Sequence, residues 1–358
     1  MPPDPILQGL DSGDVTALAR AISLVENQRD GFERVLTHMH ERLGRTGARR
    51  IGITGPPGAG KSTLTEQLIR AFRGQGLKVA VVAVDPTSPF SGGALLGDRI
   101  RMETASTDPG VFIRSMATRG SIGGLATTTE EVCDVLDAFG FERILIETVG
   151  VGQTELDVAR TAETTVLVLV PESGDGIQTL KAGVMEVADV YVINKADRPG
   201  AEKMQREIEI MLGIRRGNAY RHVGAHHRAD GRSGGRAVDR GSESNRPPDR
   251  PTGELGGWEP PVLQTVAPKG EGVPALLEAL DRHRVFLEAS GRLAARRRER
   301  LGERTRAAVN RAVQQWVWEG SSAESILAQA LDDMTAGTRS PYEVAAEILE
   351  QARSGAAR

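Results

Sequence analysis

The chain has 358 residues, of which 39% are hydrophobic and 4% aromatic, and its formal net charge is −3. This length predicts one large or two smaller domains, and the nearly neutral charge argues against a general nucleic-acid binder. The single cysteine, Cys133, excludes an internal disulfide and fits a reducing compartment. No apolar stretch approaches the roughly 20 residues of a membrane span, and no signal peptide is recognisable. We therefore expect a cytoplasmic protein that binds neither membranes nor nucleic acid.

The N-terminal part is predicted to be helical. Between residues 5 and 46, leucine, isoleucine, valine and phenylalanine recur at roughly helical spacing. Asp14 precedes Val15 and can cap one of these helices by accepting a hydrogen bond from the backbone of the first turn. We assign residues 1–46 to an N-terminal helical extension.

Apolar, β-branched runs then alternate with helical patterns. The predicted strands are 51–54, 78–84, 143–149, 165–170, 190–194 and 262–267. One helix is predicted directly after residue 62, and further helices are predicted at 129–139, 177–188, 201–212 and 273–287. This alternation predicts an α/β fold with a doubly wound, mostly parallel sheet over residues 47–290. Ligands on such sheets bind beyond the carboxyl ends of the strands.

The first predicted strand leads into a loop of the pattern G-x-x-x-x-G-K-[ST], and a helical pattern follows. Glycines let backbone N–H groups surround phosphate oxygens, and a helix N-terminus adds positive potential. Lys61 can reach the β- and γ-phosphates as a catalytic residue, and the Ser62 hydroxyl can hold Mg²⁺. The alternative is a glycine-rich turn with an incidental Lys-Ser pair. The predicted nucleotide-binding residues here are Gly55, Pro56, Pro57, Gly58, Ala59, Gly60, Lys61, Ser62 and Thr63.

The strand predicted at 190–194 ends in the sequence Asn-Lys-Ala-Asp, which matches the N-K-x-D pattern that recognises guanine. The Asp197 carboxylate can accept the N1–H and the exocyclic amine of guanine, a donor pair that adenine lacks. Lys195 can lay its aliphatic stem along the base, and Asn194 can brace the loop. Ala267, at the end of the last predicted strand, can offer its backbone N–H to guanine O6. The alternative for 194–197 is a polar strand-to-helix turn.

Glu147 follows the apolar part of the strand predicted at 143–149, beside the phosphate loop. Its carboxylate can act on Mg²⁺ through a water or orient the attacking water, and its length favours the outer-sphere contact. Gly150 can donate a backbone N–H to the γ-phosphate and start a switch that includes Gln153. The alternative for Glu147 is a capping residue after a strand.

Two further carboxylates follow the second predicted strand. Asp85 ends it, and Asp98 follows in a charged segment with Arg101. Both carboxylates can join the Mg²⁺ shell, which prefers hard oxygen ligands, and Arg101 can neutralise charge on the transferring phosphoryl group. The alternatives are a strand-end turn for Asp85 and a solvated charged turn for the other two. The later loop 174–181 contains two glycines, and its Gln178 and Lys181 can reach the nucleotide or a partner, or simply face solvent.

Residues 215–258 form a polar segment rich in arginine, glycine, serine and proline, which predicts a flexible insertion. Its charges and histidines could contact an acidic partner or a metal, but a solvated loop is the simpler prediction. Residues 291–358 are again predicted to be helical, with Pro341 starting the last helix. This C-terminal extension can pack on the main domain or on a second copy of itself. Cys133 lies in an apolar helical stretch, which favours a buried structural thiol.

Together these motifs resemble the MeaB/ArgK family of GTPases, the methylmalonyl-CoA mutase-associated proteins with a P-loop NTPase fold. The resemblance extends over most of the chain. Besides the phosphate loop and residues 194–197, it includes the stretches 17–26, 84–86, 97–102, 112–114, 147–155 and 340–342.

This resemblance implies a GTP-hydrolysing chaperone for an adenosylcobalamin-dependent acyl-CoA mutase, which gates cofactor delivery to the mutase and protects it. It also implies a homodimer joined through the C-terminal extension. By matching position, Asp85, Asp98 and Glu147 would belong to the Mg²⁺ and catalytic region, and Gln178 and Lys181 to a switch that responds to the mutase.

Three other functions remain open from the sequence. A metallochaperone GTPase for nickel insertion would need Cys and His ligands near the switches. A transport-associated, nucleotide-dependent kinase or ATPase would need a base site that accepts adenine, which residues 194–197 disfavour. The third is a nucleotide-binding module without turnover, which measurable release of phosphate would exclude.

Overall fold

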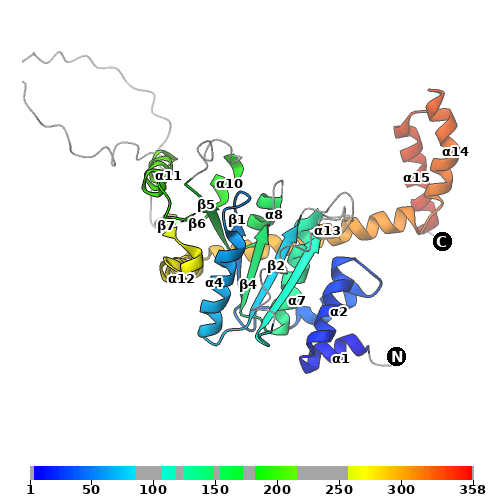
Figure 1. Ribbon diagram of the computed structural model, residues 1–358. Helices are drawn as coiled ribbons and strands as arrows, with labels where there is room; N and C mark the ends of the chain where they lie inside the picture. The colour runs from blue at the N-terminus through cyan, green and yellow to red at the C-terminus, as the bar shows by residue number, and fades with distance from the viewer. Residues whose placement is uncertain are drawn as a thin grey trace, which may run out of the picture.

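The computed structural model describes residues 4–85, 107–117, 124–148, 154–171, 182–215 and 257–356. Of these, residues 85, 117, 124–126, 154–157, 182–184, 215 and 355–356 are described by their backbone only. Within these residues, seven strands form one parallel sheet in the order β3-β2-β4-β1-β5-β6-β7 (Figure 1). The strands are β1 (Arg49–Thr54), β2 (Val79–Asp85), β3 (Val111–Ala117), β4 (Arg143–Thr148), β5 (Thr164–Leu169), β6 (Val190–Asn194) and β7 (Val262–Thr265). The predicted parallel α/β fold is therefore confirmed.

Six of these strands lie where the sequence predicts them, but β3 was missed. The β3 sequence interrupts its apolar pattern with Arg114 and Ser115, so neither strict alternation nor a continuous apolar run identifies it. Among the described strands it pairs with β2 alone, at one edge of the sheet. The Arg114 guanidinium forms an ion pair with Glu26 of a neighbouring N-terminal helix, which explains how a charged residue is accommodated there.

The predicted N-terminal helical segment consists of α1 (Pro5–Ser12), α2 (Val15–Glu26) and α3 (Phe32–His40). Asp14 caps α2 as predicted, because its carboxylate accepts a 2.8 Å hydrogen bond from the Thr16 N–H. These helices pack with α7 (Gly124–Phe139) and α8 (Thr154–Thr161) on one face of the sheet. Cys133 is buried in this layer, so the predicted structural thiol is confirmed.

Alternating strand residues divide the core between the two faces of the sheet. Ile51 and Ile53 point to the face covered by α4 (Lys61–Gly74) and α12 (Val273–Ala289). Gly52 faces α8 instead, where a Cβ atom would lie 2.9 Å from the side chains of Val158 and Ala162. Helices α10 (Ala182–Val187) and α11 (Ala201–Arg215) cover β5 and β6. Helices therefore lie on both faces, as the doubly wound prediction requires.

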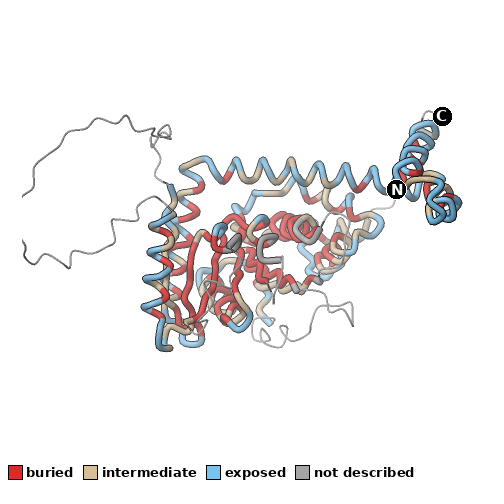
Figure 2. Tube along the Cα trace, turned by 90° about the horizontal axis from the view of Figure 1, so that it is seen from above, coloured by how far each residue is buried: buried red, intermediate tan, exposed pale blue. Residues whose placement is uncertain are grey.

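The C-terminal extension consists of α13 (Arg292–Trp318), α14 (Ala323–Thr335) and α15 (Pro341–Ala356). α13 runs along the α/β domain and continues beyond it, and α14 and α15 form a separate hairpin at its far end (Figures 1 and 2). The hairpin has its own small core, which includes Ala330, Val344 and Ile348. Pro341 starts α15 as predicted.

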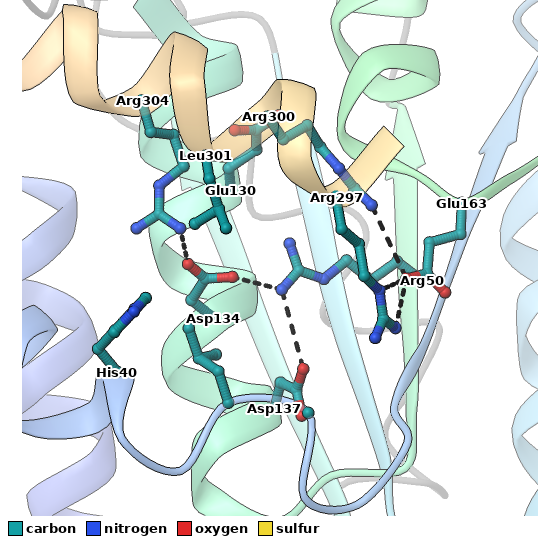
Figure 3. A pocket seen from close by; sticks show the side chains of 12 residues that line it. His40, Arg50, Glu130, Asp134, Asp137, Glu163, Arg297, Arg300, Leu301 and Arg304 are labelled. Atoms are coloured by element: carbon teal, nitrogen blue, oxygen red, sulfur yellow. Dashed lines mark hydrogen bonds and ion pairs between the residues drawn. The ribbon is translucent and has the colours of Figure 1, made fainter. Parts of the chain in front are cut away.

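The first half of α13 is fixed to the α/β domain mainly by charge. Its arginines at positions 297, 300 and 304 share one helix face, and they meet acidic groups of α7 and of the segment after α8 (Figure 3). Glu163 is 3% exposed, and its carboxylate accepts hydrogen bonds from Arg284 and Arg297, each at 2.6 Å. A cavity of about 270 Å³ between these groups is lined mainly by four arginines and four carboxylates, most of which form ion pairs with one another. Its charges are balanced within the protein, so we do not assign it a ligand.

None of the helices in the described part of the chain has the length and apolar character that crossing a membrane requires.

Candidate functional site

The carboxyl ends of β1, β4, β6 and β7 bring the predicted nucleotide-binding motifs together. The predicted phosphate loop follows β1, which lies in the middle of the sheet, and leads directly into α4. Two of its glycines are required by close contacts. A Cβ atom on Gly55 would lie 2.1 Å from the carbonyl oxygen of Val168, and one on Gly60 would lie 2.3 Å from the Asn194 side-chain nitrogen. Both also have positive φ, 142° and 86°. The loop is therefore wedged between β5 and the end of β6.

Lys61 is the first residue of α4 and is 7% exposed. Its Nζ donates to the carbonyl oxygens of Gly55 and Pro56, at 2.8 and 3.1 Å. The ammonium group thus lies against the loop, where the helix N-terminus also contributes positive potential. This arrangement concentrates positive charge at the predicted phosphate position.

Glu147 lies near the end of β4, is 1% exposed, and contacts α4 through both carboxylate oxygens. Ser62 Oγ donates to Glu147 Oε1 at 2.6 Å, and Thr65 Oγ1 donates to Glu147 Oε2 at 2.8 Å. The sequence predicts the proximity of Glu147 to the loop but not the contact with Thr65. The available signal is helical spacing, since residues 62 and 65 are three apart and therefore share one face of α4.

Asn194 joins the phosphate loop to the end of the last strand. Its side chain is buried, and its Nδ2 donates to the Ala59 carbonyl oxygen at 2.8 Å. Its Oδ1 accepts hydrogen bonds from Thr265 Oγ1 and from the Ala267 N–H, both at 3.1 Å. The predicted bracing of the loop by Asn194 is thus present. The Ala267 N–H, which we predicted to bind guanine O6, is engaged with Asn194 in this structure.

Lys195 and Asp197 follow on the turn between β6 and α11. Lys195 has a φ of 56°, in the left-handed region that non-glycine residues rarely adopt. The Ala196 N–H donates to the Thr265 carbonyl oxygen at 3.0 Å, which ties this turn to β7. The turn that carries the predicted guanine motif therefore lies beside the phosphate loop.

Several predicted site residues cannot be placed. Asp85 ends β2 next to β4, but its side chain lies outside the described part of the structure. Six further predicted residues also lie outside it, namely Asp98, Arg101, Gly150, Gln153, Gln178 and Lys181. Most of the predicted insertion, residues 216–256, lies outside it as well.

The oxygen atoms around Ser62 fit a bound Mg²⁺ chemically. The serine hydroxyl and the Glu147 carboxylate are hard oxygen donors, as Mg²⁺ prefers, and they lie at the start of the helix that follows the phosphate loop. Among the described residues, no group of three or more His, Cys, Asp or Glu side chains could hold a metal ion by itself. Mg²⁺ typically binds through few protein ligands together with nucleotide phosphates, so the described residues fit an ion that arrives with a nucleotide.

A second buried polar cluster lies at the amino ends of the strands, on the side of the sheet opposite the phosphate loop. His283 of α12 is 1% exposed, and its Nδ1 lies 2.9 Å from Thr164 Oγ1, at the start of β5. Its Nε2 lies 3.3 Å from Asp189 Oδ1, just before β6. Burial lowers the pKa of His283 to about 3 and raises the pKa of Asp189 to about 6. Because these groups lie at the amino ends of the strands and are enclosed, we interpret them as a structural attachment of α12 and not as part of the nucleotide site.

The parallel sheet, the glycine loop leading into α4 and the guanine motif after β6 define a P-loop nucleotide-binding protein of the GTPase type. A solved structure of a LAO/AO transport system kinase is similar, with a TM-score of 0.62 and 26% identity, covering 96% of this chain and 95% of that one.

The comparison of sequences identifies the family. The family model described as methylmalonyl-CoA mutase-associated GTPase MeaB matches residues 18–322, and the chain belongs to this family. A protein named as a GTPase in Pyrococcus abyssi is 44% identical over 352 residues, which cover 98% of this chain and 97% of that protein. The mouse protein named methylmalonic aciduria type A homolog, mitochondrial, is 35% identical over 82% of this chain and 66% of its own length. The resemblance stated from the motifs is therefore confirmed.

Proposed function

We propose that the protein is a Mg²⁺-dependent GTP hydrolase that acts as a chaperone and gatekeeper for an adenosylcobalamin-dependent acyl-CoA mutase. In this proposal it controls cofactor loading of methylmalonyl-CoA mutase or a relative and protects that enzyme. The observation that carries the nucleotide part is the Asn194 side chain, which connects the phosphate loop to the strand end beside the guanine motif. The partner part is supported by the family description and by the name of the mouse relative.

In the proposed reaction, water attacks the γ-phosphate of GTP in line and GDP leaves. The loop amides and Lys61, which already lies against the loop carbonyls, would stabilise the charge that develops on the phosphoryl oxygens. A bound Mg²⁺ would supply further neutralisation of that charge. Ser62 would hold the ion through its hydroxyl, and Glu147 would accept the hydrogen bond of that hydroxyl from behind. Glu147 would also act on the ion through a water or orient the attacking water.

The residues outside the described structure keep their predicted roles as proposals. Asp85 and Asp98 would contribute to the metal shell, and Arg101 would contact the transferring phosphoryl group. Gly150 and Gln153 would belong to a segment that senses the γ-phosphate, and Gln178 and Lys181 to a loop that responds to the mutase. At the base, Asp197 would select guanine, Lys195 would cover the ring, and the Ala267 N–H would leave Asn194 or be shared with guanine O6.

We also propose a homodimer formed through the C-terminal extension. Val309, Val313 and Trp316 lie on one face of the second half of α13, at spacings of four and three residues. They are 56%, 48% and 41% exposed in the single chain. A second copy of the extension would cover this apolar face, as the resemblance to the family implies.

The division of the chain into domains at residues 1–46, 47–290 and 291–358 is also a proposal, and so is the cytoplasmic location that the sequence predicts.

A second candidate function is supported by one comparison. The similar solved structure is described as a LAO/AO transport system kinase, so transfer of the γ-phosphate to another protein is an alternative to hydrolysis. The nickel-insertion alternative has no comparable support within the described residues, where the buried Cys133 lies in an apolar layer.

The experiment combines binding and turnover. Purified candidate mutases are captured with the protein in the presence of GDP or a non-hydrolysable GTP analogue, and phosphate release from GTP is measured with and without each mutase. We expect slow turnover by the protein alone, nucleotide-dependent capture of one mutase, and faster turnover in its presence. Lys61→Ala should abolish turnover. Rapid hydrolysis by the protein alone, together with no captured mutase and no change of rate when a mutase is added, would contradict the proposed chaperone role. Transfer of the labelled γ-phosphate of GTP to a transport protein would favour the kinase.

A further inference from the structure

A buried hydroxyl beneath the proposed magnesium position has no assigned role. Thr65 lies on the first turns of α4, is 0% exposed, and is surrounded along this helix by the apolar core residues Leu64, Leu68 and Ile69. A buried hydroxyl costs free energy unless it forms a hydrogen bond. The Thr65 hydroxyl forms that bond with Glu147 Oε2, at 2.8 Å.

The contact fixes the orientation of a carboxylate that has considerable freedom by itself. The terminal torsion of a glutamate side chain has broad minima, so a single hydrogen bond leaves the plane of its carboxylate free to rotate. Glu147 is held at both oxygens instead, by Ser62 at Oε1 and by Thr65 at Oε2. Because both hydroxyls come from the same helix, the two bonds also align β4 with the start of α4.

The orientation of Glu147 in turn determines what the Ser62 hydroxyl can do. A hydroxyl has one proton and two lone pairs. When Ser62 donates its proton to Glu147 at 2.6 Å, both lone pairs of Oγ become available to a cation. If the carboxylate turned away, the same proton could point toward the cation and weaken its binding. Groups that orient a metal ligand from behind commonly affect metal affinity about 10- to 100-fold.

We propose that Thr65 is a positioning residue for the Mg²⁺–nucleotide complex. It holds Glu147 in the rotation that accepts the Ser62 proton, and it thereby presents the Ser62 oxygen to the ion. The proposal rests on the proposed function, because it concerns the Mg²⁺ that accompanies GDP or GTP. It is specific to the threonine hydroxyl and assigns no contact between Thr65 and the nucleotide.

The test separates the hydroxyl from the shape of the side chain. Thr65→Val removes the hydroxyl and retains the branched shape, whereas Thr65→Ser retains the hydroxyl. Thr129→Val is a matched control, because Thr129 is also buried on a helix, and its hydroxyl has no hydrogen-bond partner in the structure. Affinity for a fluorescent GDP analogue is measured over a Mg²⁺ titration and in EDTA, and folding is checked by circular dichroism.

We expect the wild type, Thr65→Ser and Thr129→Val to share one Mg²⁺ dependence. In Thr65→Val, half-maximal tightening of GDP binding should require about tenfold more Mg²⁺, while the affinity in EDTA stays unchanged. If Thr65→Val does not fold, the same Mg²⁺ titration is carried out with Thr65→Ala, which also lacks the hydroxyl. An unchanged Mg²⁺ dependence, or an equal loss with and without Mg²⁺, would overturn this inference alone. A wild-type protein that binds no guanine nucleotide would overturn the proposed function as well.

Discussion

Asn194 offers the sharpest test of how the phosphate loop is held. Its side chain forms three hydrogen bonds in a buried position, to the Ala59 carbonyl, the Thr265 hydroxyl and the Ala267 N–H. Asn194→Ala removes all three and leaves a carbonyl, a hydroxyl and an amide without this partner. The loop and the end of β7 would then no longer be joined through this side chain.

The expected size of the effect follows from the number of bonds. A hydrogen bond contributes a net 0.5–1.5 kcal/mol, and each buried group left unsatisfied costs about 1–3 kcal/mol. Taking about 1 kcal/mol for each of the three bonds, we expect the free energy of unfolding to fall by about 3 kcal/mol. For a domain of 150–250 residues, 1 kcal/mol corresponds to roughly 2–4 °C in Tm. The midpoint of the α/β domain should therefore fall by roughly 6–12 °C.

The assay is thermal unfolding without nucleotide, followed by circular dichroism. Asn310→Ala is the control, since Asn310 is exposed on α13, and such surface changes usually stay within about 0.5 kcal/mol. We also expect Asn194→Ala to bind GDP more weakly than the wild type. A Tm within about 2 °C of the wild type would refute the claim that Asn194 holds the loop in place.

Two further predictions concern the structure around this site. Glu163→Gln should lower the free energy of unfolding by about 3 kcal/mol, because it removes the buried carboxylate that pairs with Arg284 and Arg297 and leaves Arg284 with only the more exposed Glu288 among the described residues. The assay is urea unfolding, and equal midpoints for variant and wild type would argue against the proposed role of charge in fixing α13. Burial raises the pKa of the Cys133 thiol to about 11 from 9.0, so its contribution to stability is complete below about pH 9 and is lost as the pH rises toward 11. The thiolate is the reactive form, so at pH 8 Cys133 in the folded protein should react slowly with a thiol reagent, whereas the same reagent should label it at once in denaturant. Rapid labelling of Cys133 in the folded protein would contradict this burial.

Much of the α/β domain is predictable because its strands are buried on both faces. The runs at β4, β5 and β6 are nearly continuous in apolar residues, and their positions agree with the sequence within one residue. β3 is different because it is an edge strand whose Arg114 is satisfied by a partner on α2, distant in sequence. Local pattern carries no information about such a partner.

The site shows the same division between local and distant information. The phosphate loop and the residues after β6 are contiguous motifs, so the sequence identifies them directly. The contacts that join them involve residues far apart in the chain, such as Asn194 with Ala59 and Thr65 with Glu147. Parallel strands explain why these groups meet at one edge, but the choice of partners depends on side-chain packing that only the folded structure provides.

The most direct test of the account is calorimetric titration of the protein with GTP, GDP and ATP in the presence of Mg²⁺. We predict that the guanine nucleotides bind with one site per chain and that ATP binds at least roughly a hundredfold more weakly, because adenine lacks the donor pair for Asp197. Asp197→Ala should remove most of this preference, and Lys61→Ala should weaken both guanine nucleotides. Equal affinity for ATP and GTP, or an unchanged base preference in Asp197→Ala, would contradict the account.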